Sequence, residues 1–469
     1  MTGKNSKIEE IYKNLSRQDK EGIMEFLKCT LFNQSDIVLS IHHYLSEHLS
    51  KDNDLNKPEL YKAVFNKNEK YSDVKLRVFI TKLTKLIEKY LIVKSIDSYP
   101  LAELSILNQY YRKNHLHKNY TVFFNSKSEV NFDSYEEYLM YEYAFSMRKL
   151  DYISQEFNSD SDRIRKHFDE VLIAQQKLSF FQTLKTQCDF LSFTQRYKSD
   201  RDNSYEENII NQLIATRDEQ DVVFKGYILV YLLSKEPLEE SFLQLKDIVL
   251  SEEIKYETNY RALITHSQNY CIRFINSGKS EYLTHLFDIY SLSLKFFKNP
   301  GDLNTANFRN ILNCALQLGH IEWAEKFVEN YYTKVNESEQ ENTYNFNYAR
   351  IYFEKQDYKT AMRQLLKVSY EDSFYASTGR ILLIKCYYEL NDELPLLSSC
   401  GSLSQFLHRN KEFTKQRVEN NLHFIKYVKT LQNNRLSGTK DYFRKLKLKV
   451  SDSTVVQKEW LLKKIEELS

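Results

Sequence analysis

The fold of this chain is decided by a stretch that reads FRNILNCALQLGHIEWAEKFVENY at residues 308–331, and by its counterpart NFNYARIYFEKQDYKTAMRQLLKV at residues 345–368. In each stretch, apolar residues recur at intervals of three and four on either side of Gly319 or Gln356. This spacing places the apolar residues on one face of a helix. Each stretch therefore predicts a helix, a tight turn and a second helix.

The same pattern recurs around four turn centres, Gly278, Gly319, Gln356 and Asn391, which are 41, 37 and 35 residues apart. Seven positions per unit (8, 7, 4 and 3 before the turn; 5, 9 and 12 after it) are hydrophobic in all four units, 28 residues in total. With a composition of 42% hydrophobic residues, about 12 of these 28 positions would be hydrophobic by chance. A fifth unit around Glu236 matches at six positions, with Ser241 as the exception. One helix pair cannot bury both its faces, so the pairs must stack into a tetratricopeptide-like α-solenoid.

Composition also predicts an all-α protein. The 469 residues are 42% hydrophobic and 28% charged, with only nine Gly and five Pro. So few turn-forming residues argue against a many-stranded β fold and against glycine-rich nucleotide-binding loops.

Residues 1–97 form a first helical region. Ser16 and Asp19 have the spacing of a capping box, and Pro58 stands where a short helix would begin. A longer helix is predicted over Ser72–Leu91, followed by Leu91–Val93 as a strand. This order is typical of a winged-helix-like domain, and a plain helical bundle gives the same pattern.

Three regions follow. Residues 98–220 form either a helical linker or the start of the solenoid, with helices predicted over 135–157, 162–177 and 179–197. Residues 221–433 hold the repeats, and residues 434–469 form a basic helical tail. Residues 405–469 contain 15 Lys and Arg against 7 Asp and Glu, although the whole chain has a net charge of only +2. Such an uneven distribution can mark a basic docking end.

Several features predict a cytoplasmic protein that does not span a membrane. The six cysteines lie far apart, without a C-x-x-C pair, which is typical of buried, reduced thiols. Residues 1–10 show no signal peptide, and the longest apolar run, Tyr227–Leu233, is too short to cross a bilayer.

The sequence offers little chemistry. It contains no phosphate-binding glycine loop, no zinc-protease motif and no Cys/His zinc spacing. The histidine clusters (His42, His43 and His48; His115 and His117) lack Cys or well-placed carboxylate partners. The loop at residues 158–162 is better explained as a helix-breaking cap than as a cation site. We therefore expect no enzyme activity, no metal site and no cofactor.

A binding groove is the stronger expectation. In arrays of this kind the first helix of each unit lines the concave face, and its exposed positions fall about ten and six residues before the turn. These positions predict a polar, basic row made of Arg309, Asn313, Arg350 and Lys385, with Phe346 beside it. Such a row suits a carboxylate or an acidic peptide. Solvated helix faces are the alternative explanation.

Two other basic patches are candidates for nucleic-acid binding. Lys75, Lys82, Lys85 and Lys89 lie on the helix that a winged helix would use for recognition. Near the C-terminus, Arg444, Lys445 and Lys447 alternate with aromatic and aliphatic residues, a pattern that suits single strands. Ordinary solvated amphipathic helices also explain both patches and are the simpler explanation.

Several stretches resemble a large, uncharacterised family of tetratricopeptide-like helical-repeat proteins from Bacteroidota. They are NYCIRFIN (269–276), LQLGHIEWAE (316–325), YARIYF (348–353), FLHRN (406–410) and KYSDVKLR (70–77). The resemblance covers residues 260–430 best, and it implies the repeat fold and a bacterial cytoplasmic setting. It brings no activity and no catalytic motif.

Together these features predict a non-enzymatic scaffold or adaptor that holds an unknown protein or acidic peptide in its groove. A nucleic-acid-binding regulator that uses residues 1–97 and the basic tail is the alternative. The sequence does not fix the partner or the oligomeric state.

Overall fold

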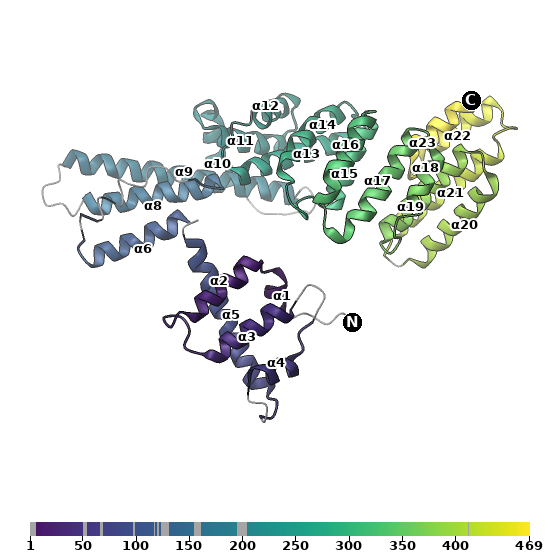
Figure 1. The fold of residues 1–469 in the computed structure, drawn as a ribbon. Helices are drawn as coiled ribbons and strands as arrows, with labels where there is room; N and C mark the ends of the chain where they lie inside the picture. Colours follow the sequence, from purple (N-terminus) through teal and green to yellow (C-terminus); the bar gives the residue numbers. More distant parts are fainter. Residues whose placement is uncertain are drawn as a thin grey trace. The chain divides into compact units, whose positions relative to one another are not determined.

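The computed structural model describes residues 6–49, 54–65, 69–96, 99–116, 118–119, 122, 131–153, 161–194, 204–410 and 412–469. Within these residues the chain forms helices and no strand, so the predicted all-α class is confirmed (Figure 1). The chain divides into two compact units, Met1–Gln182 and Thr183–Ser469.

The first unit begins with five helices around one apolar core. They are α1 (Lys7–Asn14), α2 (Arg17–Lys28), α3 (Asp36–His48), α4 (Lys57–Val64) and α5 (Asp73–Ser95). Two of the predicted helix starts are confirmed. The Ser16 side chain accepts a hydrogen bond from the backbone N–H of Asp19 at 3.0 Å, and Pro58 lies in the first turn of α4.

The strand predicted at Leu91–Val93 is wrong, because these residues continue α5 to Ser95. A three-residue apolar run cannot distinguish a strand from the end of a helix. Leu83, Leu86 and Ile87 are buried in the core at helical spacing, whereas Leu91, Ile92 and Val93 are exposed on the last turns of the same helix. The described part of residues 1–97 is thus purely helical and contains no β wing.

The unit continues with α6 (Pro100–Lys113), α8 (Tyr135–Ile153) and most of α9 (Ser161–Thr194). The prediction of two helices, 162–177 and 179–197, is wrong, since α9 is one helix of 34 residues. No Gly or Pro lies at residues 177–179 to end it. Ser161 and Asp162 open α9, and residues 158–160 of the proposed cation loop lie outside the described residues.

The second unit is a succession of antiparallel helix pairs, visible side by side in Figure 1. After α10 (Ser204–Ala215), the pairs are α11 (Val222–Lys235) with α12 (Glu239–Leu250), α13 (Glu257–Asn276) with α14 (Tyr282–Ser293), α15 (Thr305–Gln317) with α16 (Ile321–Tyr331), α17 (Gln340–Glu354) with α18 (Tyr358–Leu365), and α19 (Ser373–Glu389) with α20 (Glu393–Arg409). The repeat fold predicted from the hydrophobic columns is confirmed.

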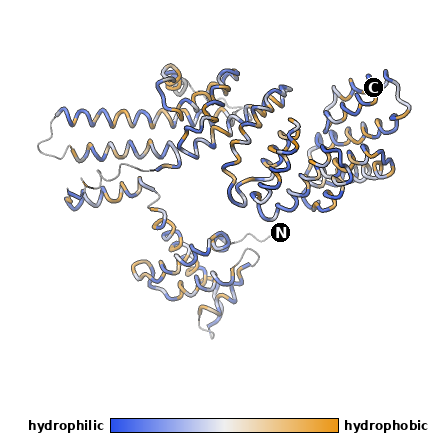
Figure 2. Tube along the Cα trace, turned by 45° about the horizontal axis from the view of Figure 1, so that its top comes forward, coloured by the Kyte–Doolittle hydropathy of each residue, from blue (hydrophilic) through white to orange (hydrophobic). Residues whose placement is uncertain are grey.

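The hydrophobic columns form the core of this array. None of the 28 side chains is exposed, and the four that lie seven residues before each turn are completely buried, namely Cys271, Leu312, Ala349 and Ile384. Figure 2 shows the matching alternation of apolar and polar segments along the helices. Burying both faces of each pair between its neighbours is what holds the stack together.

All four predicted turn centres have a left-handed backbone, with φ of 96° at Gly278, 76° at Gly319, 63° at Gln356 and 57° at Asn391. At each turn this residue donates its N–H to the carbonyl three residues earlier, and the next residue donates to the carbonyl five residues earlier. This is the Schellman pattern, which satisfies the last carbonyls of a helix.

The basic segment 434–469 is part of the array. It forms α22 (Lys440–Asp452) and α23 (Lys458–Glu467), which follow α21 (Lys415–Asn433). Phe443, Leu461 and Ile465 are buried in the same core as residues of α19, α20 and α21. The array therefore includes α21, α22 and α23.

Candidate functional site

The first helices of the last repeats line a groove with a volume of about 1230 Å³. Its walls come from the C-terminal parts of α13, α15, α17 and α19, and from α23. The repeat pattern predicted that the first helix of each unit lines a groove of this kind. The groove is therefore built by periodicity, since equivalent positions of successive units fall on the same face.

The predicted basic row and Phe346 beside it all line one recess of about 390 Å³ in this face. These residues are Arg309 and Asn313 on α15, Phe346 and Arg350 on α17, and Lys385 on α19. Their exposure differs from the prediction, because Phe346 and Lys385 are buried, at 3% and 8% exposed. Phe346 packs against Phe374 and Tyr375, so it belongs to the core beneath the recess.

The two arginines are held in different ways. Arg350 is half-buried and donates to the amide oxygens of Asn313 and Asn347. The Arg309 guanidinium stacks on the ring of Phe374, 3.8 Å from its centroid. These contacts fix the positions of both guanidinium groups without neutralising their charges, because amide oxygens and an aromatic ring carry no net charge.

Lys385 is a buried cation. Its ammonium donates to Oε1 of Gln457 at 3.1 Å and lies 4.4 Å from the ring centroid of Phe353. Burial lowers the pKa of Lys385 to about 8, with Arg350 lowering it further and Glu354 opposing the shift. Burial also lowers the pKa of Arg350 to about 10. Arg309, Arg350 and Lys385 are called the cation cluster below.

The cation cluster has an excess of positive charge. Among the described residues, none of its members forms an ion pair with a carboxylate within 4.0 Å. Glu354 is the carboxylate of the recess, and it interacts with both Arg350 and Lys385. Glu389 lies nearby on α19, but its oxygens accept from Trp460 Nε1 and Lys464 Nζ, both at 2.9 Å. The cluster can therefore attract an anion from outside.

The contribution of α23 was missed by the sequence reasoning. Gln457, with φ 58°, precedes α23 and accepts the bond from Lys385, and Trp460 lies against Tyr388 and Phe424. A signal was available, since Trp460 is one of only two tryptophans and stands in a tail that was treated as a surface. Nothing local in the tail shows that it folds back against α19.

The predicted nucleic-acid residues are partly engaged elsewhere. Lys75 pairs with Glu69 at 2.6 Å, and Lys445 and Lys447 pair with Asp441 and Glu466. The aromatic residues of the tail, Tyr442 and Phe443, pack into or against the core.

The remaining basic residues have no common arrangement. Lys82 and Lys85 are exposed on α5, and Lys89 lies 4.9 Å from the centroid of Phe32. Arg444 is exposed on α22. The tail therefore does not interleave free aromatic rings with free cations, as the single-strand prediction required.

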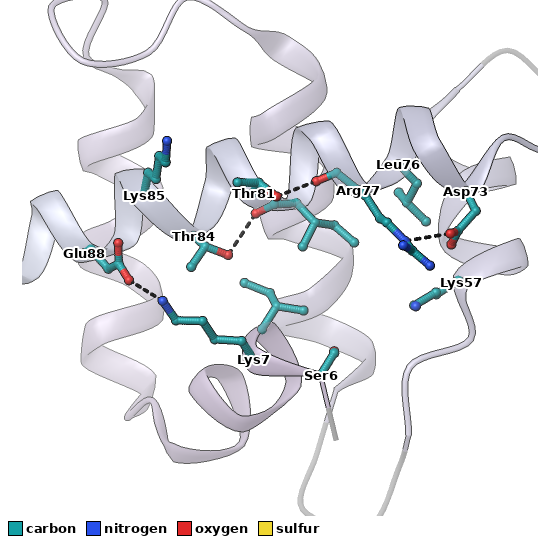
Figure 3. Close-up of a pocket in the computed structure, with 12 residues that line it drawn as sticks. Ser6, Lys7, Lys57, Asp73, Leu76, Arg77, Thr81, Thr84, Lys85 and Glu88 are labelled. Carbon is teal, nitrogen blue, oxygen red and sulfur yellow. Dashed lines mark hydrogen bonds and ion pairs between the residues drawn. The ribbon is translucent and has the colours of Figure 1, made fainter. Parts of the chain in front are cut away.

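Of the predicted α5 lysines, Lys85 borders a second, smaller pocket of about 350 Å³ in the first unit. Figure 3 shows it between Lys7, which bonds Glu88, and Arg77, which bonds Asp73, with Lys57 beside that second pair. Lys85 projects away from the other labelled side chains in this view. Each end of the pocket thus carries its own internal ion pair, and Lys57 and Lys85 are the lining cations outside these two pairs.

The histidines and cysteines show no chemical site. His42 is buried between the Tyr12 hydroxyl (2.5 Å) and the carbonyl of Lys20 (3.0 Å), and His117 lies outside the described residues. In the described part of the chain, no three His, Cys, Asp or Glu side chains gather to hold a metal ion. Five of the six cysteines are buried free thiols, whereas Cys29 is exposed, contrary to expectation.

Within the described ranges, no helix is both long and apolar enough to cross a bilayer. In comparisons with known proteins, no family model, no curated protein and no solved structure matched this chain. The resemblance to a Bacteroidota repeat family thus stays a prediction.

Proposed function

We propose that this protein is a non-enzymatic adaptor that holds an acidic segment of a partner protein in the groove of its helical repeats. The observation that carries the proposal is the cation cluster, three positive groups in one recess with a single carboxylate among them. A groove formed by successive first helices supplies a long surface for an extended or helical segment. Fixed cations select an acidic one through charge-assisted hydrogen bonds.

The test is a pair of charge variants in the full-length chain. Arg309→Glu with Asn313→Asp places negative charge at the mouth of the recess, and the carboxylate introduced by Asn313→Asp can still accept from Arg350. Lys82→Glu with Lys85→Glu is the control, because it changes the net charge similarly on the exposed face of α5. The tagged proteins are isolated from the native host at moderate salt, with and without nuclease, and bound proteins are identified by mass spectrometry.

We expect one stoichiometric protein that survives nuclease, is lost from the groove variant and remains bound to the control. A purified segment of that protein rich in Asp, Glu or phosphorylated residues must then bind the unmodified chain directly. If nuclease removes all bound proteins and the α5 variant loses retention on DNA or RNA, the adaptor proposal fails. A nucleic-acid-binding regulator, the second function considered from the sequence, takes its place.

A further inference from the structure

The net charge of the recess indicates which kind of acidic group would bind there. The recess contains three positive charges, on Arg309, Arg350 and Lys385, and one negative charge, on Glu354. Its net charge is therefore about +2. One carboxylate would neutralise only half of this charge. A phosphoryl group carries about −1.5 to −2 at neutral pH and would neutralise it almost entirely.

The hydrogen-bond donors support the same ligand. Lys385 donates one bond to Gln457, and Arg350 donates two bonds to amide oxygens. A lysine ammonium has about three donors and a guanidinium about five, so several N–H groups of these residues remain for a ligand. Among the described residues, the contact of the Arg309 guanidinium is its stacking on Phe374, which leaves its N–H edge free to donate. Three acceptor oxygens on one phosphorus atom match the three cations that line this recess.

Burial provides an independent reason for a bound dianion. Lys385 is only 8% exposed, and among the described residues no carboxylate oxygen lies within 4.0 Å of its ammonium. An uncompensated buried charge is destabilising, and such perturbed groups concentrate at binding sites. A ligand anion would supply the missing compensation.

We propose that the cation cluster binds a phosphoryl dianion carried by a side chain of the partner segment. This inference rests on the proposed adaptor function and goes beyond it by naming the recognised group. Binding is expected to depend on pH through Lys385. The charged and titratable groups that act on Lys385 are Arg350 and Glu354 on α17, and Cys386 and Glu389 on α19.

Because the pKa of Lys385 lies at about 8, the cluster loses one positive charge as pH rises through that value. A bound dianion favours the protonated amine, so binding takes up protons near pH 8. Affinity is therefore highest below pH 8 and decreases above it.

Trp460 is a built-in reporter, because its ring lies 5.5 Å from Lys385 Nζ. Replacing the other tryptophan, Trp323→Phe, in the full-length chain makes Trp460 the only tryptophan fluorophore. The fluorescence is titrated with inorganic phosphate and with acetate at constant ionic strength. We expect saturable binding of phosphate at least about tenfold tighter than that of acetate at pH 7.5. We also expect sulfate, a dianion that does not titrate in this range, to bind several times more weakly at pH 9 than at pH 7.

Three variants locate the site. Lys385→Met and Arg350→Gln should each weaken phosphate binding about tenfold or more, since each removes a charged donor. Glu354→Gln should strengthen it, because the competing carboxylate is gone. Lys463→Met is the matched control: it removes a lysine from the wall of the larger groove, outside the recess, and should leave binding unchanged. Circular dichroism verifies that each variant is folded.

Equal affinities for phosphate and acetate, or unchanged binding in folded Lys385→Met and Arg350→Gln, would overturn the inference. To identify the source of the phosphoryl group, N-acetyl-O-phosphoserine methylamide is compared with glycerol 1-phosphate. Tighter binding of the former supports a phosphorylated side chain, whereas tighter or equal binding of the latter reassigns the recess to small phosphate esters. The two proposals can fail separately. If a partner protein binds and phosphate does not compete with it, the adaptor function holds and the phosphoryl site is overturned. If phosphate binds to the recess but no partner protein is found, the phosphate site holds and the adaptor function is overturned.

Discussion

At the scale of single residues, the turns between paired helices are the most regular feature of the second unit. Each needs one residue with positive φ, and the chain uses Gly278 and Gly319 in two turns but Gln356 and Asn391 in the other two. A side chain is strained in this conformation, whereas glycine adopts it freely. No atom lies within 4 Å of where a Cβ would stand at Gly319. A side chain at this position would therefore meet no steric clash, and only backbone strain would oppose it.

We expect Gln356→Gly to raise the free energy of unfolding by about 0.5 kcal/mol, because the released strain exceeds the added flexibility of the unfolded chain. Gly319→Ala should lower it by about 1 kcal/mol for the converse reason. Urea unfolding followed by circular dichroism measures both. Gln356→Ala, which keeps a Cβ at the left-handed residue, is the control and should change little. If Gln356→Ala stabilises the protein as much as Gln356→Gly, the strain explanation is incorrect.

At the scale of elements, α23 packs against the repeat array through a buried polar contact as well as through its apolar face. The side chains of Lys464 and Glu389 are 9% and 10% exposed, and Glu389 also accepts from the indole of Trp460. Lys464 forms a second bond, to Glu467, which is half exposed. A buried pair of this kind fixes one orientation of α23, because any other leaves a charge without a partner.

Glu389→Ala should lower the free energy of unfolding by about 3 kcal/mol, since Lys464 and the Trp460 indole lose their buried acceptor. Combining Glu389→Met with Lys464→Met should restore most of this loss, because no buried charge remains. The exposed pair of Lys447 and Glu466 provides the control, and Lys447→Met should alter stability by only about 0.5 kcal/mol. A double variant as unstable as Glu389→Ala would show that packing, rather than charge compensation, controls this contact.

At the scale of the whole molecule, the second unit is a linear stack in which each helix packs mainly against its neighbours. The stability of such arrays is close to a sum of local terms and nearest-neighbour terms. Damage at one repeat should therefore spread to adjacent helices and leave the separate core of α1–α5 intact.

Leu312→Ala tests this expectation, because Leu312 is fully buried on α15. We expect a loss of about 2–5 kcal/mol in the array. Hydrogen exchange followed by mass spectrometry should show faster exchange in α13–α18 and unchanged exchange in α1–α5. Faster exchange in α1–α5 as well would mean that the two units unfold as one cooperative body.

The sequence by itself determined the helical class, the repeat period and the positions of the four turns. All three depend on local chemistry: apolar spacing along a helix, and the backbone preferences of residues at its end. It also placed Arg309, Arg350 and Lys385 on one face, because equivalent positions of successive units coincide in a stack. Only the tertiary structure decided that Phe346 and Lys385 are buried, and that α23 returns to the groove with Gln457 and Trp460. Those outcomes depend on contacts between residues about 70 positions apart, such as Lys385 with Gln457, and local patterns carry no information about such pairings.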